Sequence, residues 1–272
     1  MPRKAIALVA LIAIAIAGAI GGRIIFPPPT SDPVTPLPRI SATDFDHHHL
    51  AFDEILKIHV RDELVDYRSL KSAPEALLAY LGQLAAVTRS EFESWDRDQQ
   101  LAMLINLYNA ATLKLVIDHY PVKGIKSIGG LFKKPWDIEA LTLFGETITL
   151  NHLEHEILRN DYDEPRIHFA IVCAAKGCPA LRPGAYSAEE LDVQLEQQGR
   201  SFLADPTKNR VDAAAQTIYL SKIFRWFAED FEKDDGSVID FVKPYFPPSA
   251  AAALTDEFKI RYTDYDWSLN EE

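Results

Sequence analysis

The chain has 272 residues, of which 47% are hydrophobic and 25% are charged, as is typical of a globular protein. It carries 40 Asp and Glu against 28 Lys and Arg, which gives a net charge of −12. Because so acidic a chain repels phosphate backbones, we expect it to have no nucleic-acid partner.

The N-terminus carries a candidate membrane segment. Arg3 and Lys4 precede residues 5–22, which are all Ala, Ile, Leu, Val or Gly. Such a run suits an uncleaved transmembrane anchor or a signal peptide with a small-residue cleavage site, and a buried core helix is the third alternative. The basic flank favours a cytoplasmic N-terminus. We therefore expect residues 1–26 to be a signal anchor or signal peptide. The body would then be extracytoplasmic in the cell envelope, either anchored by one helix or secreted or periplasmic after cleavage.

Residues 27–38 form a proline-rich linker, since six of these twelve residues are Pro. This composition favours extended polyproline geometry and cannot form a packed core. The remaining residues 39–272 are enough for one sizeable core and contain no internal repeat or second linker. We expect them to form a single globular domain.

The domain begins with a helical pattern. Apolar residues at helical spacing predict a helix over 52–59, and an Ala- and Leu-rich stretch predicts another over 74–86. Residues 47–49 are three histidines in a row. Neighbouring helical residues point in different directions, so we expect this triplet to be solvated surface rather than a metal site.

The strongest helix prediction covers residues 97–119 and ends before Pro121. Apolar residues occur on most of its faces, so much of it must be buried. Asn106 and Asn109 share one face. Because buried amides must be hydrogen-bonded, either both hold neighbouring loop backbone, or at least one points into a site as an oxyanion donor or an orienting group.

A hairpin is predicted next, in which LTLF and TITL flank a type II′ turn at Gly145 and Glu146. A helix over 151–159 follows, with the sequence NHLEHEILR. Asn151 suits its N-cap, and Glu154 completes a capping-box pattern. Glu154 therefore has a structural interpretation beside a functional one.

The second half of the domain mixes strands and helices without a regular βαβ alternation. The predicted elements are a strand over 166–172, a helix over 187–204, a hairpin over 211–220, a helix over 222–231 and a final strand over 258–267. This pattern indicates an α+β fold with a mostly antiparallel sheet packed with helices.

Cys173 and Cys178 are the only cysteines. Outside the cytoplasm they could form a disulfide, because the intervening residues include Gly177 and allow the chain to turn back. Alternatively, Cys173 is a nucleophile exposed at a strand end, which requires a base or cation to lower the pKa of its thiol. In a continuous strand His168 would point to the opposite face, roughly 16 Å away. His155 on the preceding helix is therefore the candidate base.

A metal site is an alternative use of the same helix. His152 and His155 share a face beside Glu154, and Cys173 or His168 could complete a tetrahedral set. However, HLEHE matches neither the zincin pattern nor its inverted form. The chain also has no Gly-rich phosphate loop. We therefore expect no metal and no other cofactor.

Several motifs, taken together and in chain order, resemble one family. They are INLYNAATLKLVIDHYP, SIGGLFKKPWDI, LEHEILR, RIHFAIVCAAKGCPALR, LSKIFRWFAEDF and YDWSLN, and they span most of residues 50–270. The family is called domain of unknown function 547. Its members are largely uncharacterised, and many are bacterial envelope or secreted proteins, with plant relatives. The resemblance therefore implies a family without an established reaction.

The resemblance also implies which positions matter. The family's motif positions correspond to Asn106, Tyr108, Asn109, Glu154, His155, His168, Cys173 and Pro179. Plant members can carry serine in place of Cys178, so the family does not require a disulfide, and Cys173 has the stronger case for a role. Relatives often carry an acidic residue in place of His152, which weakens the metal hypothesis. Gly177 and Pro179 follow Cys173 where papain-like enzymes have a long helix, so a papain fold is not implied.

Two functional hypotheses follow. In the first, the chain is a membrane-tethered cysteine–histidine hydrolase or transferase that acts on an amide or thioester of an unknown small molecule or peptide. Its residues would be the nucleophile Cys173, the base His155, the orienting Glu154 or Asn106 and the oxyanion donor Asn109. His168 and Tyr108 would surround and support these catalytic side chains. In the second, the chain is a non-catalytic binding module of the envelope, and the Asn, His and Glu side chains form a buried structural network.

Overall fold

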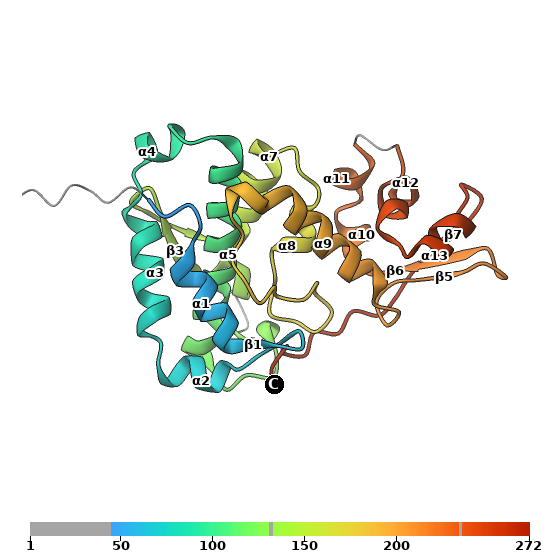
Figure 1. The fold of residues 1–272 in the computed structure, drawn as a ribbon. Coiled ribbons are helices and arrows are strands. Elements are labelled where there is room, and N and C mark those ends of the chain that lie inside the picture. Colours follow the sequence, from blue (N-terminus) through green and yellow to red (C-terminus); the bar gives the residue numbers. More distant parts are fainter. Residues whose placement is uncertain (1–44, 131–132, 234–235) are drawn as a thin grey trace, which may run out of the picture. The chain divides into compact units, whose positions relative to one another are not determined.

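The computed structural model describes residues 45–130, 133–233 and 236–272 (Figure 1). Residues 45–272 form one compact unit. The predicted anchor at 1–26 and the linker at 27–38 lie outside the described residues. Within the described part of the chain, one helix is long and apolar enough to cross a bilayer, and that helix is buried in the core.

This buried helix is α5 (Arg97–His119), around which the first half of the fold is built. Its start is fixed by a capping box, in which Asp96 accepts from the backbone N–H of Gln99 and the Gln99 side chain accepts from that of Asp96. Residues on all of its faces are buried, as the sequence predicts. The predicted helix is confirmed with the same limits.

The other helices are mostly short. The α-helices are α1 (Leu50–His59), α2 (Tyr67–Ser72), α3 (Glu75–Ala86), α4 (Arg89–Glu93), α6 (Leu150–His152), α7 (Arg159–Asp161), α8 (Ile167–Ala170), α9 (Leu191–Ala204), α10 (Ile223–Trp226), α11 (Ala228–Glu232), α12 (Val238–Val242) and α13 (Pro248–Ala253). The 3-10 helices are η1 (Ile125–Ser127), η2 (Pro135–Asp137), η4 (Ala188–Glu190) and η5 (Lys243–Tyr245). A π-helix, η3 (Leu153–Leu158), follows α6 directly.

The strands form three small sheets within the described residues. Two are antiparallel pairs, β1 (Val60–Arg61) with β2 (Leu64–Val65), and β3 (Glu139–Leu143) with β4 (Glu146–Thr149). In the third, β6 (Thr217–Leu220) pairs antiparallel with β5 (Arg210–Asp212) and parallel with β7 (Lys259–Tyr262). The α+β class is confirmed, but the strands form separate small sheets rather than one mostly antiparallel sheet.

The core consists of two hydrophobic clusters. The first surrounds α5, and the second is rich in aromatic rings and includes Phe169, Phe202, Phe224, Phe231 and Phe241. Helix α8 connects them, because Ile167 and Ala170 belong to the first cluster whereas Phe169 belongs to the second. Figure 1 shows α8 and α9 between the blue-green helices and the orange-red C-terminal part.

The predicted strand over 166–172 is wrong. Its first part is helix α8, and the following residues are extended but pair with no strand among the described residues. The Asn109 side chain takes the place of a strand partner: it donates to the carbonyl of Ala170 at 2.9 Å and accepts from the N–H of Val172 at 2.9 Å. An apolar, β-branched stretch can therefore be buried without a sheet, because a side-chain amide satisfies its backbone.

Three local predictions also need correction. The β3–β4 turn lies at Phe144 and Gly145, whose φ angles of 54° and 81° fit a type I′ turn rather than type II′. Thr149 rather than Asn151 caps the following helix, since its side chain accepts from the backbone of His152. In the histidine triplet, His49 is buried and hydrogen-bonds the hydroxyl of Tyr80 rather than facing solvent.

Candidate functional site

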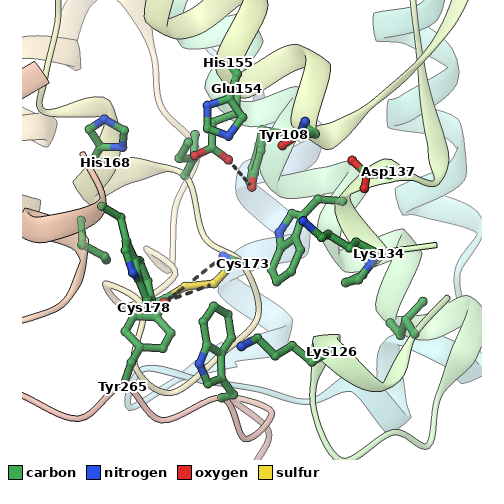
Figure 2. Close-up of a pocket in the computed structure, with 18 of the residues that line it drawn as sticks. Tyr108, Lys126, Lys134, Asp137, Glu154, His155, His168, Cys173, Cys178 and Tyr265 are labelled. Carbon is green, nitrogen blue, oxygen red and sulfur yellow. Dashed lines mark hydrogen bonds between the residues drawn. A yellow bond between two sulfur atoms is a disulfide. The ribbon is translucent and has the colours of Figure 1, made fainter. Parts of the chain in front are cut away.

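A pocket of about 740 Å³ lies beside α5 and η3 (Figure 2). It is lined by residues from α5, η1, η2, η3, α8 and α10, from residues 173–179, which we call the cysteine loop, and from residues 263–272, which we call the C-terminal tail. Those that carry chemistry are Tyr108, Lys126, Lys133, Lys134, Trp136, Asp137, Glu154, His155, His168, Cys173, Cys178, Trp226, Phe227, Tyr265 and Trp267. Its size is that of a site for a small-molecule ligand.

The π-helix η3 contributes two adjacent residues to this pocket. The N–H of Arg159 bonds the carbonyl of Glu154, five residues earlier, which is π-helical spacing. A wider turn reduces the angle between neighbouring side chains from the 100° of an α-helix to roughly 80°. Glu154 and His155, neighbours on this wider turn, both line the pocket.

Glu154 is a partly buried carboxyl that faces Tyr108. The Tyr108 hydroxyl donates to Glu154 Oε2 at 3.0 Å, and Figure 2 shows the two side chains meeting above the disulfide. Burial raises the pKa of Glu154 from 4.5 to about 7, and the lowering effects of Tyr108 and Arg159 offset it only in part. A substantial fraction of this carboxyl therefore stays protonated at neutral pH.

Next to Glu154, an ion-pair cluster fixes the two histidines. Asp230 receives two hydrogen bonds from Arg159, at 2.6 and 2.8 Å, and one from His168 Nε2 at 2.6 Å. Burial raises the pKa of Asp230, but the donors His168 and Arg159 outweigh it and hold this pKa well below its usual value. Burial lowers the pKa of His168, so His168 donates in its neutral form.

The state of His155 follows from the same cluster. Arg159 lies 2.8 Å from His155 Nδ1, and an arginine only donates, so Nδ1 is the acceptor nitrogen of this ring. Burial and the charge of Arg159 lower the pKa of His155. In the resulting neutral ring the proton sits on Nε2. His155 thus offers a hydrogen-bond donor in this arrangement rather than a free base.

A disulfide between Cys173 and Cys178 forms one side of the pocket. The Tyr265 hydroxyl lies 3.0 Å from Cys178 Sγ and 3.3 Å from Cys173 Sγ. The C-terminal tail holds the loop, since the N–H of Gly177 donates to the carbonyl of Asp266 at 2.8 Å. A Cβ at Gly177 would come within 2.9 Å of the Asp266 nitrogen, which explains the glycine between the two cysteines.

Aromatic rings and lysines complete the pocket. The rings of Trp226, Tyr265 and Trp267 contact one another at 4.5 to 5.6 Å between centroids, and Trp136 meets Trp267 edge-on at 5.9 Å. Lys126 Nζ lies 3.5 Å from the centroid of Trp267. The exposed residues Lys126, Lys133 and Lys134 form what we call the lysine rim. Within the described residues, the lysine rim makes no ion pair.

The structure brings together most of the site residues expected from the sequence. Tyr108, Glu154, His155, His168 and both cysteines line one pocket. Asn106 and Asn109 do not line it. Asn106 donates to the carbonyl of Tyr186 at 2.7 Å and accepts from its N–H at 3.0 Å, just as Asn109 binds the backbone around Ala170. Both amides thus hold loop backbone, which was the structural alternative.

The structure places two of the histidines differently from the predictions. His168 is not held on the opposite side from Cys173 by strand parity, because α8 is helical and both residues line the pocket. His152 is exposed and does not line the pocket, so it does not join His155 there. No group of three or more His, Cys, Asp or Glu among the described residues is arranged to hold a metal ion.

The sequence did not lead to three features of the site: the rings of Trp136, Trp226, Tyr265 and Trp267, which we call the aromatic wall, the lysine rim, and the hydrogen bonds that Asp230 accepts. A usable signal lay in KKPWDI and YDW, where tryptophan stands among charged residues in loops. Large aromatic side chains in polar segments indicate a binding surface. Nothing local to the sequence points to Asp230, whose partners lie 62 and 71 residues away.

One of the comparisons with known proteins supports a family assignment. Residues 92–203 match the model of the family described as "Protein of unknown function, DUF547". No curated protein and no solved structure matches the chain. The match is shorter than the span of motifs from 50 to 270; it includes Tyr108, Glu154 and the cysteine loop, whereas the aromatic residues from Trp226 onward lie beyond it. The match over residues 92–203 therefore supports an assignment of the chain to the DUF547 family of proteins of unknown function.

Proposed function

We propose that the pocket is the active site of an extracytoplasmic enzyme that acts by acid–base catalysis on a small anionic molecule containing a ring. Glu154 would transfer the proton. The observation that carries this proposal is the convergence of Glu154 and Tyr108 with an aromatic wall and the lysine rim around one pocket.

Glu154 suits proton transfer near neutral pH. A general acid or base works best when its pKa lies near the working pH, and burial brings the pKa of Glu154 to about 7. The Tyr108 hydroxyl fixes one carboxyl oxygen, which leaves the other to face a ligand. Such a group can protonate a leaving oxygen or nitrogen, or remove a proton from an attacking water.

The side chains that line the pocket indicate the class of ligand. Flat aromatic rings stack on the faces of sugar or aromatic rings. The lysine rim gathers positive charge on a chain whose net charge is −12, and this local field attracts an anion. An anionic ligand with a ring can contact both features at once.

The cysteine–histidine mechanism remains a proposal for the reduced protein alone. In the disulfide Cys173 has no thiol, and Nδ1 of His155 is engaged by Arg159. Proton transfer by Glu154 requires neither a reduced disulfide nor a free Nδ1 on His155. We therefore favour it over the cysteine–histidine mechanism.

The extracytoplasmic, membrane-tethered location is likewise proposed. Disulfides persist mainly in oxidising compartments, so the Cys173–Cys178 bond supports a location outside the cytoplasm. The apolar run at residues 5–22 after Arg3 and Lys4 supports an anchor or signal segment.

Calorimetric titration with two matched probes tests the ligand class. Naphthalene-2-sulfonate is an anion with a flat ring, and 2-naphthyl methyl sulfone is its uncharged counterpart. We expect the sulfonate to bind more tightly, and Lys126→Met or Lys134→Met to weaken it about two- to fivefold each while sparing the sulfone. Lys259→Met removes an exposed lysine of β7 as the control. Equal binding of both probes, or no binding at millimolar concentrations, would contradict the proposal.

The second candidate is a non-catalytic binding module. It is favoured by the disulfide, which leaves no free thiol in the pocket, and by the structural use of Asn106 and Asn109. Incubation with a panel of anionic sugars and aromatic conjugates, followed by mass spectrometry, separates the two. Products formed by the native protein but not by Glu154→Gln support the enzyme, whereas binding without conversion supports the module.

A further inference from the structure

The two sulfurs of the disulfide have different surroundings. Cys173 is partly exposed at the pocket wall, whereas Cys178 is only 4% exposed. Cys178 Sγ has two donors: the backbone N–H of Cys173 at 3.1 Å and the hydroxyl of Tyr265 at 3.0 Å. The hydroxyl is farther from Cys173 Sγ, at 3.3 Å.

This asymmetry suits thiol–disulfide exchange. The attacked sulfur must be accessible, and the leaving sulfur departs faster when its thiolate is stabilised. Donors aimed at a sulfur stabilise its thiolate. Cys173 meets the first requirement, and Cys178 meets the second because two donors offset the cost of its burial.

The bond also stabilises the fold less than a disulfide that closes a long loop. Its cysteines are five residues apart, and closing so short a loop restricts the unfolded chain by about 2 kcal/mol, less than closing a longer loop does. The loop is held independently by the C-terminal tail, through Lys176 to Ser268 and Gly177 to Asp266. Opening the disulfide therefore need not release the loop.

We propose that Cys173–Cys178 is an exchangeable disulfide that oxidises small anionic thiols. The thiolate of one thiol attacks Cys173 Sγ, the bond to Cys178 breaks, and Cys178 leaves as a thiolate. A second thiolate then attacks the sulfur bound to Cys173, which releases the disulfide of the small thiol and leaves both cysteines reduced. The lysine rim lies around the same pocket and attracts the anionic thiol.

The first test is to find which cysteine carries the adduct. The folded protein is treated with 2-mercaptoethanesulfonate, quenched with acid, alkylated with N-ethylmaleimide and mapped by mass spectrometry. We expect the mixed disulfide on Cys173. An adduct on Cys178, or a disulfide that reacts only after unfolding, would overturn the proposal.

Rates provide a second test. We expect Tyr265→Phe to slow the reduction roughly tenfold, because a hydrogen bond to the departing thiolate is lost. Tyr219→Phe on β6 is the control and should leave the rate unchanged. If Tyr265→Phe does not fold, matched single-cysteine proteins replace it. Cys178→Ser should take up bis(2-sulfonatoethyl) disulfide at least tenfold faster than Cys173→Ser, and equal rates would count against the proposal.

Thiol charge distinguishes this inference from the proposed function. After normalisation to thiolate concentration, we expect 2-mercaptoethanesulfonate to react roughly three- to tenfold faster than 2-mercaptoethanol at low salt, with the difference shrinking at high salt. A neutral thiol that reacts equally fast overturns the anion preference. The position of the adduct on Cys173 does not depend on Glu154 or on ring binding, so either claim can fail while the other holds.

Discussion

At the scale of single residues, the chemistry of the pocket depends on how burial acts on one carboxyl. Glu154 and Asp230 are both acidic, and their environments move their pKa values in opposite directions. Asp230 has donors on both oxygens, from Arg159 and His168, whereas Glu154 has the hydroxyl of Tyr108. Two carboxyl groups in different surroundings thus provide one fixed anion, Asp230, and one exchangeable proton, on Glu154.

The raised pKa of Glu154 predicts a pH-dependent change in stability. In the folded protein the pKa of Glu154 is about 7, above its ordinary value of 4.5. The contribution of this carboxyl to the free energy of unfolding is therefore complete below pH 4.5 and is lost as the pH rises through 7. Glu154→Gln cannot ionise and escapes this loss. Relative to the native protein, we expect its free energy of unfolding to rise by up to roughly 3 kcal/mol between pH 5 and pH 8.

Urea unfolding at both pH values measures this difference. Glu156→Gln, an exposed neighbour on the same π-helix, is the matched control and should change stability by less than about 0.5 kcal/mol at either pH. A Glu154→Gln protein whose advantage is the same at pH 5 and pH 8 would show that Glu154 has an ordinary pKa.

At this scale the sequence identifies titratable groups better than their partners. The pattern LEHE and the cysteine loop lead to Glu154, His155 and Cys173, which share the pocket. The asparagines of α5 are harder to interpret, because the sequence does not distinguish a buried asparagine that faces a ligand from one that binds a backbone carbonyl. Asp230 cannot be found locally, since its partners are brought to it by the tertiary fold.

At the scale of elements, the segment from α8 to the cysteine loop depends on Asn109 rather than on a sheet. Asn109→Ala removes the acceptor for the Val172 N–H and the donor to the Ala170 carbonyl. We expect a loss of about 2–4 kcal/mol in the free energy of unfolding, because two buried backbone groups lose their partners.

Hydrogen exchange should also show the amides near residue 172 losing protection in Asn109→Ala. Asn151→Ala removes an exposed asparagine and should be nearly neutral. Unchanged stability and protection in Asn109→Ala would mean that this amide does not hold the segment.

Asp230 holds three elements together, since it joins Arg159 of α7 and His168 of α8 to α11. We expect Asp230→Asn to cost about 3 kcal/mol at pH 7, because it leaves a partly buried arginine without its counter-charge. The control is Asp163→Asn, which breaks the exposed pair with Lys233 and should cost less than about 1 kcal/mol. Equal losses in the two variants would contradict a special role for Asp230.

At the scale of the whole molecule, α9 packs closely against the aromatic cluster. Gly199 lies where an added Cβ would come within 2.6 Å of Tyr245 and 3.0 Å of Phe169. We expect Gly199→Ala to destabilise the protein by roughly 1–3 kcal/mol despite the better helix propensity of alanine.

Gly82 of α3 provides the opposite case, because a Cβ there meets nothing within 4 Å. Gly82→Ala should raise the free energy of unfolding by about 0.5–1 kcal/mol. Thermal unfolding of both variants measures the difference, and effects of the same sign would contradict the close approach of α9 to this cluster.

The whole fold could be predicted from the sequence only in part. Helix α5, α1, α3 and the β5–β6 hairpin follow from local periodicity and are present. The secondary structure of residues 166–172 does not follow from local periodicity, because the hydrogen-bond partner of their backbone is a side chain on another helix. The parallel pairing of β7 with β6 and the return of the C-terminal tail to the cysteine loop are also long-range effects.

The most direct measurement is a pH titration of the Glu154 carboxyl by 13C NMR, in the free protein and with naphthalene-2-sulfonate, using Glu154→Gln to assign the signal. We expect an apparent pKa near 7 in the free protein and a higher value with the anion bound, because a nearby negative charge favours the protonated form. Burial lowers the pKa of both His155 and His168 below the ordinary histidine value. A carboxyl that titrates near the ordinary value of about 4.3 and does not respond to the anion would contradict Glu154 as the proton-transfer group of this pocket.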